Sequence, residues 1–191
     1  TQSLSSAASD VYKRQGITSH TGGLTIAGTT PATVAELMTI NAATSGTVVL
    51  NSQTIATAYT DTAANLISAF TGITSHTGGL TVSDTGAVSA ADLTNISSST
   101  SGLTTANATT HIIGSSAEIV AAIGAVVEAA NVNFTITGVA ATIAELKVLN
   151  AATSGIIVIS PGTTAQNYDD TAANLAAAFD GITTSTSTLT I

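Results

Sequence analysis

The chain has 191 residues, of which 44% are hydrophobic, 3% are aromatic and 7% are charged, and its formal net charge is −8. With three Lys and Arg residues in all it lacks the basic clusters that hold phosphate groups, which excludes nucleic acid as a partner, and the absence of Cys excludes a disulfide framework or a thiolate metal site. The most apolar run, residues 119–127, is far too short to cross a bilayer, so we expect no membrane-spanning segment.

The stretch at residues 1–15 differs in composition from everything that follows. Residues 10–15 read DVYKRQ and hold Lys13 and Arg14, two of the three basic residues. This string resembles the translated end of a transposase adapter used in sequencing libraries. We therefore expect residues 1–15 to be a non-native leader, with a native basic patch as the alternative. The chain also starts without Met, which leads us to expect a fragment of a longer protein.

The rest of the chain, residues 16–191, is predicted to be a single array of repeats. The string GITSHTGGLT at residues 16–25 returns unchanged at residues 72–81, 56 positions later. Repeats of this kind bury their apolar faces against neighbouring repeats. The repeats are predicted at residues 16–71, 72–130 and 131–181, with a partial one at 182–191. We interpret the identical string as the joint between repeats rather than as a site.

The first repeat begins with a short predicted strand at Leu24–Ile26. Thr33 and Glu36 then stand three residues apart before an apolar run, a capping-box spacing that predicts the start of a helix. Gly46 follows the run and is predicted to end the helix in the left-handed conformation. The β-branched residues at 47–50 predict a buried strand.

The second half of the first repeat contains a second helix. Residues 55–59 predict a further, more exposed strand before it. Asp61 opens the string DTAANL, and its charge suits the first turn of a helix whose buried stripe includes Leu66 and Phe70. Gly72 is predicted to end this helix.

The second repeat follows the same plan in its first half only. A strand is predicted at Leu80–Val82, and Ser89 and Asp92 have the spacing of another capping box. Residues 103–111 are poor in large apolar side chains, and the helix predicted over about 115–130 is longer and lacks DTAANL. This repeat is therefore atypical.

The third repeat returns to the pattern of the first. A strand is predicted at residues 134–136, a capping box at Thr142 and Glu145, and a second strand at 156–159. The string DTAANL also returns, at residues 170–175, 109 positions after its first occurrence.

The spacing of the predicted strands indicates the fold class. They start at residues 24, 47, 80, 103, 134, 156 and 189, so that long and short half-repeats alternate. One strand plus one helix per half-repeat predicts an α/β solenoid with a parallel sheet and right-handed crossovers, similar to a leucine-rich repeat by analogy of architecture. The last strand begins a further repeat, and we expect both ends of the chain to be cut from a longer array.

His20 and His76 occupy the same repeat position and are the only candidates for a metal site. A zinc or copper site needs three or four ligands, and no acid lies near either histidine in sequence. We therefore expect no metal and interpret both as exposed loop histidines copied by duplication. Ser-His pairs at these two positions, and His111, lack a nucleophile elbow, so we expect no catalytic triad.

The acidic residues are interpreted as helix caps rather than as catalytic or calcium-binding groups. Asp61 and Asp170 open the two DTAANL helices, and the acids in the predicted capping boxes have the required spacing. Calcium binding by Asp169 with its neighbour is the alternative, but no calcium-loop string is present. We expect no enzyme activity and no cofactor.

Two groups of polar residues suggest surface chemistry. Asn95, Asn107 and Asn133 each begin an N-glycosylation sequon, although such matches are expected by chance in a chain this rich in Ser and Thr. Residues 183–190 are rich in Thr, so that a hydroxyl ladder able to order water is a further hypothesis.

DTAANL at residues 61–66 and 170–175, with its flanking short strands and capped helices, resembles the repeated segments of very large secreted or surface proteins of bacteria, including cyanobacteria. The resemblance covers about residues 16–191. It implies an extracellular structural or adhesive repeat module without catalytic residues, whose partners are neighbouring repeats and surface glycans. A carbohydrate-, mineral- or ice-binding repeat surface is the alternative, and a polysaccharide-active enzyme would need its acids clustered in space.

Overall fold

We describe a computed structural model of the chain, which covers residues 2–4, 20–138, 140–159, 167–184 and 189–190. The chain divides into two compact units. The first comprises Thr1–Ser83 and Asn95–Thr105, and the second comprises Asp84–Thr94 and Ala106–Ile191. The described residues have an α/β fold, and the predicted α/β class is confirmed.

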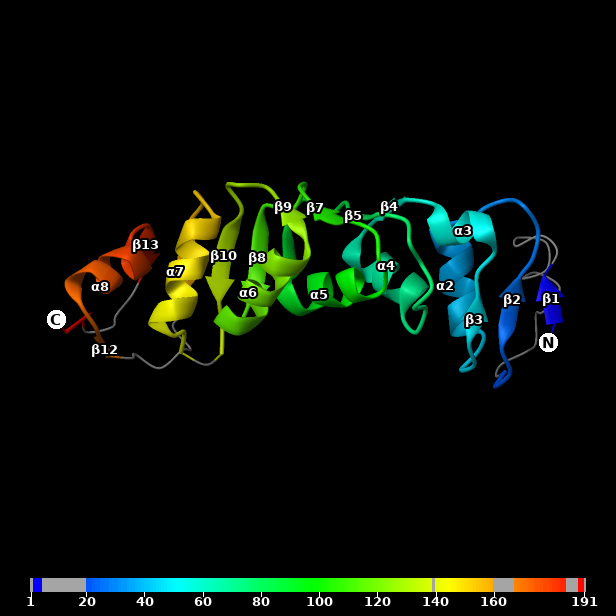
Figure 1. Ribbon diagram of the computed structural model, residues 1–191, viewed down its shortest axis with the longest axis horizontal. Helices are drawn as coiled ribbons and strands as arrows, with labels where there is room; N and C mark the ends of the chain where they lie inside the picture. The colour runs from blue at the N-terminus through cyan, green and yellow to red at the C-terminus, as the bar shows by residue number, and fades with distance from the viewer. Residues whose placement is uncertain (1, 5–19, 139, 160–166, 185–188, 191) are drawn as a thin grey trace. The chain divides into compact units, whose positions relative to one another are not determined.

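The first compact unit alternates short strands and helices (Figure 1). Its elements are β1 (Gln2–Leu4), β2 (Leu24–Ile26), α2 (Val34–Ala42), β3 (Val48–Val49), α3 (Ser52–Ala56), β4 (Tyr59–Asp61), α4 (Ala63–Phe70) and β5 (Leu80–Val82). Helix α5 (Ala90–Ser98) and strand β7 (Thr104–Ala106) are divided between the two units.

The strands of the first compact unit pair in parallel in two places. Strands β1, β2 and β3 form one sheet, with Leu24 opposite Val48, and β4, β5 and β7 lie side by side in another. Strand β1 lies within residues 1–15 and pairs with β2 through its backbone. The non-native origin of that stretch stays a prediction.

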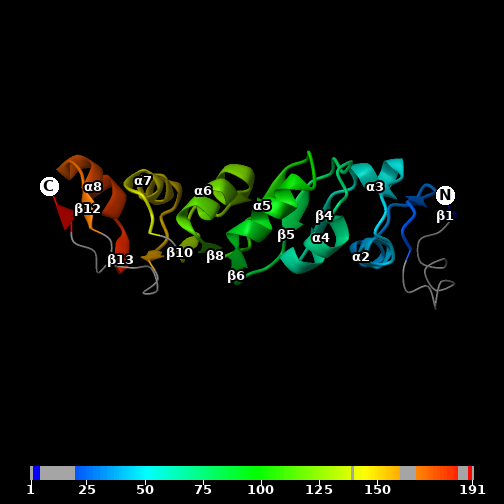
Figure 2. The same ribbon diagram turned by 90° about the horizontal axis from the view of Figure 1, so that it is seen from below.

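The second compact unit contains a larger parallel sheet, in the order β13-β11-β10-β8-β6. Helices α6, α7 and α8 lie along one side of it (Figure 2). The elements of the unit are β6 (Ala87–Ser89), β8 (His111–Gly114), α6 (Ser116–Ala125), β9 (Val127–Glu128), β10 (Asn133–Ile136), α7 (Ile143–Ala152), β11 (Ile157–Ile159), β12 (Tyr168–Asp169), α8 (Ala172–Phe179), β13 (Ile182–Thr184) and β14 (Leu189–Thr190). Strands β12 and β14 pair in parallel as a separate ribbon.

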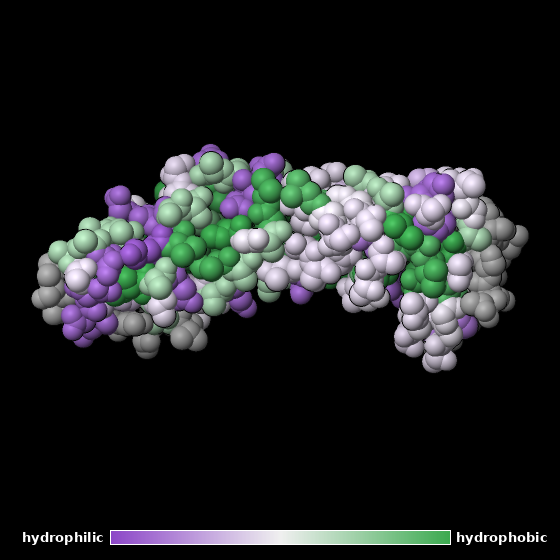
Figure 3. All heavy atoms as spheres, viewed as in Figure 1, coloured by the Kyte–Doolittle hydropathy of each residue, from purple (hydrophilic) through white to green (hydrophobic). Residues whose placement is uncertain are grey.

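Each compact unit has an apolar core made mainly of aliphatic side chains. Alternate residues of the strands point inward, as in β2, where Leu24 and Ile26 are buried. In the second unit Phe134, Ile112 and Leu146 are completely buried. Much of the visible surface is pale in Figure 3, the colour of residues with intermediate hydropathy, which fits a chain with 7% charged residues.

The predicted strands and helices are confirmed in most places, with three corrections. The predicted parallel pairing is confirmed, although the described strands form several parallel sheets where one was predicted. The strand predicted at 55–59 is wrong. Asn51 accepts a hydrogen bond from the amide of Thr54 and caps a short helix, α3, while the strand begins at Tyr59.

The helix predicted over about 115–130 ends early, at Ala125. The β-branched residues Val126 and Val127 follow, and Val126 adopts an extended backbone. Among the strands after residue 15, β6, β8, β9, β12 and β13 were not predicted.

No helix in the described part of the chain is both long and apolar enough to cross a membrane.

Candidate functional site

The most regular feature of the structure is a polar contact made by Thr-Ser-Gly after a helix. At residues 44–46 the Thr44 hydroxyl donates to the Gly22 carbonyl at 2.7 Å and accepts from the Gly46 amide at 2.9 Å. The Ser45 amide donates to the carbonyl of His20 at 2.9 Å. We call this arrangement the TSG clip. It joins the chain after one helix to the backbone of an earlier segment.

The same contacts recur in the other two repeats. At residues 100–102 the Thr100 hydroxyl donates to the backbone carbonyl of Gly78 at 2.7 Å. The backbone amide of Ser101 donates to the backbone carbonyl of His76 at 3.0 Å. At residues 153–155 the Thr153 hydroxyl donates to the carbonyl of Val132 at 2.5 Å. The clip therefore occurs once in each repeat, including the atypical second one.

The glycine of the clip is required for a close approach of two backbones. A Cβ atom added at Gly46 would lie 2.5 Å from the carbonyl oxygen of Gly22, and one at Gly155 would lie 2.5 Å from that of Val132. The prediction that Gly46 adopts the left-handed conformation is wrong, since positive φ among the described glycines is found at Gly28, Gly72, Gly138 and Gly181. Gly72 does end its helix in that conformation, as predicted.

Two further side-chain ties connect neighbouring segments in both typical repeats. The Tyr59 hydroxyl donates to the carbonyl of Ala32 at 2.7 Å, and the Tyr168 hydroxyl donates to that of Ala141 at 3.0 Å. Each tyrosine also packs against a phenylalanine, with ring centroids 5.5 Å apart in the first repeat and 5.0 Å in the third. Burial raises the pKa of both phenols.

An asparagine in the last turn of the first helix of each typical repeat ties that helix to the DTAANL helix of the same repeat. The Asn41 amide donates to the carbonyls of Ser68 and Thr71, both at 3.0 Å. The Asn150 amide donates to the carbonyl of Ala177 at 3.0 Å. Carbonyls at a helix C-terminus have no partner within the helix, so these bonds satisfy groups that need one.

Asp61 and Asp170 precede their helices rather than capping them. The N-caps are Thr62 and Thr171, so each aspartate stands one residue before the N-cap. The prediction that it lies in the first turn of the helix is wrong. Each aspartate accepts from the amide of the following threonine and from an asparagine side chain four residues on, at 2.7–2.8 Å. These hydrogen bonds, first from the side chain of Asn174, lower the pKa of Asp170.

The capping boxes at Thr33 and Thr142 are confirmed. In each, the threonine accepts from the glutamate amide and the carboxylate accepts from the threonine amide. A third box, Ser115 with Glu118, was not predicted, although its spacing is visible in the sequence. At Ser89 the hydroxyl accepts from the amide of Asp92 at 3.5 Å, one half of the predicted box. Hydrogen bonds from the N-cap lower the pKa of Glu118 and Glu145.

Among the described residues of the first compact unit, His76 is the most deeply buried side chain that can titrate, at 1% exposed. Its ring lies 4.6 Å from that of Phe70 and 5.6 Å from that of Tyr59. Nε2 lies 3.0 Å from the carbonyl of Thr57, which only accepts, so Nε2 carries the proton of the neutral ring. Nδ1 lies 3.1 Å from the hydroxyl of Thr100. The expectation of an exposed loop histidine is therefore wrong for His76.

Burial lowers the pKa of His76, against a weaker opposing effect of the Thr57 carbonyl. His20, at the equivalent position, is half-buried.

The third histidine is His111, whose Nε2 atom lies 2.5 Å from the hydroxyl oxygen of Thr135. No group of three or more His, Asp or Glu side chains that could hold a metal is found in the described ranges.

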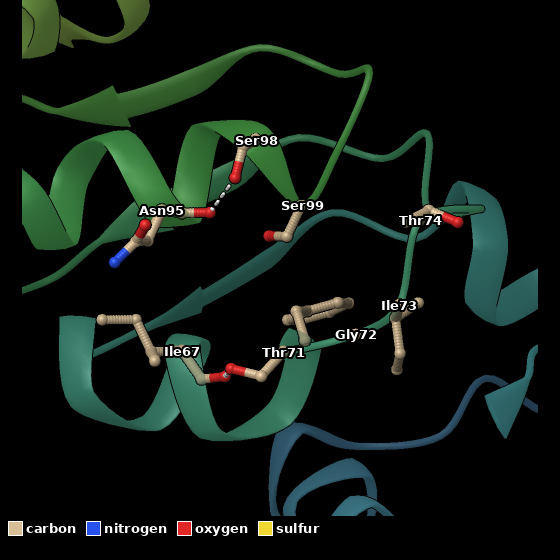
Figure 4. A pocket seen from close by; sticks show the side chains of 9 residues that line it. Ile67, Thr71, Gly72, Ile73, Thr74, Asn95, Ser98 and Ser99 are labelled. Atoms are coloured by element: carbon tan, nitrogen blue, oxygen red, sulfur yellow. Dashed lines mark hydrogen bonds between the residues drawn. The ribbon is translucent and has the colours of Figure 1, made fainter. Parts of the chain in front are cut away.

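A pocket of about 340 Å³ lies between the end of α4 and the end of α5 (Figure 4). Ile67, Phe70 and Ile73 contribute apolar groups to its lining. Asn95 and Ser98 lie across from Ile67, on α5 (Figure 4). The Ser98 hydroxyl donates to the Asn95 carbonyl at 2.8 Å. None of the described residues that line the pocket is titratable, so none of them is suited to acid–base catalysis.

The sequon asparagines lie in three different environments. Asn95 is exposed on helix α5, Asn107 is exposed in the turn after β7, and Asn133 is half-buried with its side-chain oxygen accepting from the amide of Ile156 at 2.7 Å. Part of the predicted hydroxyl ladder at 183–190, namely residues 185–188, lies outside the described residues.

Another row of hydroxyls, unpredicted, crosses the sheet of the first compact unit. Thr60 pairs with Thr81, and Thr81 pairs with Thr105, on three adjacent parallel strands. The Thr105 hydroxyl donates to that of Thr81 at 2.9 Å. Thr60 is exposed, and the other two are half-buried.

Comparison of the chain with protein-family models, with curated proteins and with solved structures gave no match.

Proposed function

We propose that the chain is a structural or adhesive repeat module of a large extracellular bacterial protein, in which successive repeats stack as a solenoid and no catalysis takes place. The observation that carries the proposal is the TSG clip. It recurs at residues 44–46, 100–102 and 153–155 with the same donors and acceptors. Contacts conserved within one chain in this way support a role in holding repeats together.

The polar side chains with defined partners support the same proposal. The carboxylates of Glu36, Glu118 and Glu145 accept hydrogen bonds at helix starts, and Asn41 and Asn150 donate to carbonyls at helix ends. Side chains engaged in this way fix backbone geometry. A surface poor in charge and rich in hydroxyls suits a spacer exposed to solvent.

The proposal is tested by changing the number of repeats. In a stacked array, stability is the sum of repeat terms and nearest-neighbour terms, so it rises with repeat number. We expect a chain that carries a second copy of residues 16–71 to melt at a higher temperature than the 191-residue chain, as followed by circular dichroism. Equal melting temperatures would remove the proposal.

A glycan- or ice-binding surface is a second candidate, favoured by the row Thr60, Thr81 and Thr105. The backbones of adjacent strands lie about 4.8 Å apart, so the three threonines recur at a regular interval across the sheet, which suits a repeating polar ligand. Binding on a glycan array or inhibition of ice recrystallisation, lost in Thr81→Val, is the expected result for this candidate. No activity in either assay would remove it.

A further inference from the structure

The pocket between the end of α4 and the end of α5 lies within the first compact unit, to which all of its described lining residues belong (Figure 4). Its volume of about 340 Å³ stands at the lower end of the ~300 to 1,000 Å³ that ligand pockets span. The pocket therefore has room for one small molecule of the size of a single sugar ring, and not for a chain of several rings.

The charge of the lining limits the kind of ligand. None of the described residues that line the pocket is Asp, Glu, Lys, Arg or His. An ion that left water for this pocket would find no opposite charge there, and an unpaired charge is costly to desolvate. The pocket therefore favours a neutral ligand.

The hydroxyl groups of the lining are arranged to accept hydrogen bonds. Three of them donate their only hydrogen to the backbone carbonyl three or four residues earlier in the chain, namely Thr71 at 2.6 Å, Ser98 at 2.8 Å and Ser99 at 2.7 Å. A hydroxyl oxygen also has two lone pairs, so each of the three can still accept. A ligand that brings several O–H donors of its own matches these oxygens.

Asn95 and Ile67 supply the other contacts that a small polar ring needs. Asn95 is exposed on α5, and its side-chain amide can both donate and accept. Ile67 is half-buried on α4 and gives the pocket an accessible apolar group, whereas Phe70 and Ile73 are buried. The lining thus combines hydrogen-bond acceptors, one amide and an aliphatic side chain.

We propose that this pocket binds one ring of a neutral sugar. A sugar is neutral, carries several O–H donors on a small ring, and has C–H groups that can pack against Ile67. The inference goes beyond the proposed structural function and does not depend on it. The described lining residues also include none of the row Thr60, Thr81 and Thr105, so the pocket is independent of the second candidate function.

NMR of the isotope-labelled 191-residue protein tests the proposal by titration with D-glucose, D-galactose and D-mannose. We expect at least one of these sugars to shift the backbone amides of residues 71–74 and 98–99 in a saturable way. D-glucuronate and D-galacturonate, which carry a carboxylate, should leave these amides unchanged, because the described lining has no cation. No shift at these amides with any of the neutral sugars, or equal shifts with the uronates, would overturn the proposal.

A substitution in the pocket provides a second arm. Asn95→Leu keeps the size of the side chain but removes its amide, so affinity for the bound sugar should fall about tenfold. Asn107→Leu, at an exposed position outside the described lining, is the matched control and should bind like the unmodified chain. Circular dichroism shows that both variants fold. Affinity that Asn95→Leu leaves unchanged would remove the pocket as the site.

A trisaccharide that ends in the bound sugar distinguishes a free sugar from the end of a glycan. If it shifts the same amides, the pocket takes the terminal ring of a chain; if only the free sugar does so, the ligand is a soluble sugar. Both results support a pocket for one ring. The dependence of melting temperature on repeat number does not involve this pocket, so failure of sugar binding leaves the proposed structural function untouched.

Discussion

The first two repeats contain the same ten residues, GITSHTGGLT, yet the histidine in each copy has different surroundings. His76 is 1% exposed between the rings of Tyr59 and Phe70, whereas His20 is half-buried. The residues at the matching distances before His20 are Ser3 and Arg14, neither of them aromatic. The identical string therefore supplies the carbonyl acceptors of the clip in both copies, while aromatic residues outside the string bury the imidazole of His76.

The largest expected effect comes from removing the ring that covers His76. Phe70→Ala should lower the free energy of unfolding by about 3–5 kcal/mol, because Phe70 is completely buried and its loss leaves a cavity. The equivalent change in the third repeat, Phe179→Ala, should cost less because that side chain is half-buried. Urea unfolding measures both, and equal losses would contradict the explanation by burial.

The clips of the two repeats should respond alike to a change of their glycine. Gly46→Ala and Gly102→Ala each place a Cβ against a backbone carbonyl and should cost about 1–3 kcal/mol. Gly86→Ala is the control, because a Cβ there meets no atom within 4 Å. Thermal melts of the three variants provide the comparison. If the clip glycines tolerated alanine as well as Gly86 does, close approach would not be the reason for glycine.

Acid should destabilise the protein through His76. Its pKa is lowered in the folded state, so the unfolded chain binds the proton first as pH falls below about 6.5. Stability that is present at neutral pH should therefore decline with falling pH until the folded pKa is passed. His76→Gln should flatten this part of the stability curve, measured by urea unfolding at several pH values. His20→Gln is the matched control, and a flattening of equal size there would refute the assignment.

The smallest expected effect is a gain of stability. Thr104 is 1% exposed, its hydroxyl has no hydrogen-bond partner among the described residues, and Val48 stands at the same position of the first repeat. Thr104→Val keeps the shape and removes an unsatisfied polar group, so it should stabilise the fold by about 1 kcal/mol. The reverse change, Val48→Thr, should destabilise the fold by a similar amount. A shift in melting temperature of the wrong sign for either variant would contradict this explanation.

Features set by residues close in sequence could be predicted, and those set by distant residues could not. The capping boxes of α2 and α7 depend on side chains three positions apart, so the spacing of Thr33 and Glu36 was enough to find the helix start. The burial of His76 depends on Tyr59 and Phe70, which lie in different elements. Helix α3 was missed because Thr54 and Ile55 favour a strand, and the cap at Asn51 overrides that preference.

The hydrogen bonds of the TSG clip were not predicted, although the tripeptide Thr-Ser-Gly recurs in the sequence. Gly46 was interpreted as a left-handed helix stop because glycine is common there. The recurrence of Thr-Ser-Gly at residues 44, 100 and 153 was the available signal, since a helix stop alone does not require Thr two residues earlier. Which backbone the threonine reaches could be learned only from the fold.

The partners of each clip threonine stand 22, 22 and 21 residues earlier in the chain. Donor and acceptor are thus carried on one stretch of sequence shorter than half of the 56-residue repeat. A gene duplication that copies such a stretch therefore copies both the donors and the acceptors of the clip, and no compensating substitution elsewhere is needed. The unchanged ten-residue string at 16–25 and 72–81 is what recent growth by this route would leave behind, and the length of such a protein can change one repeat at a time while each joint stays intact.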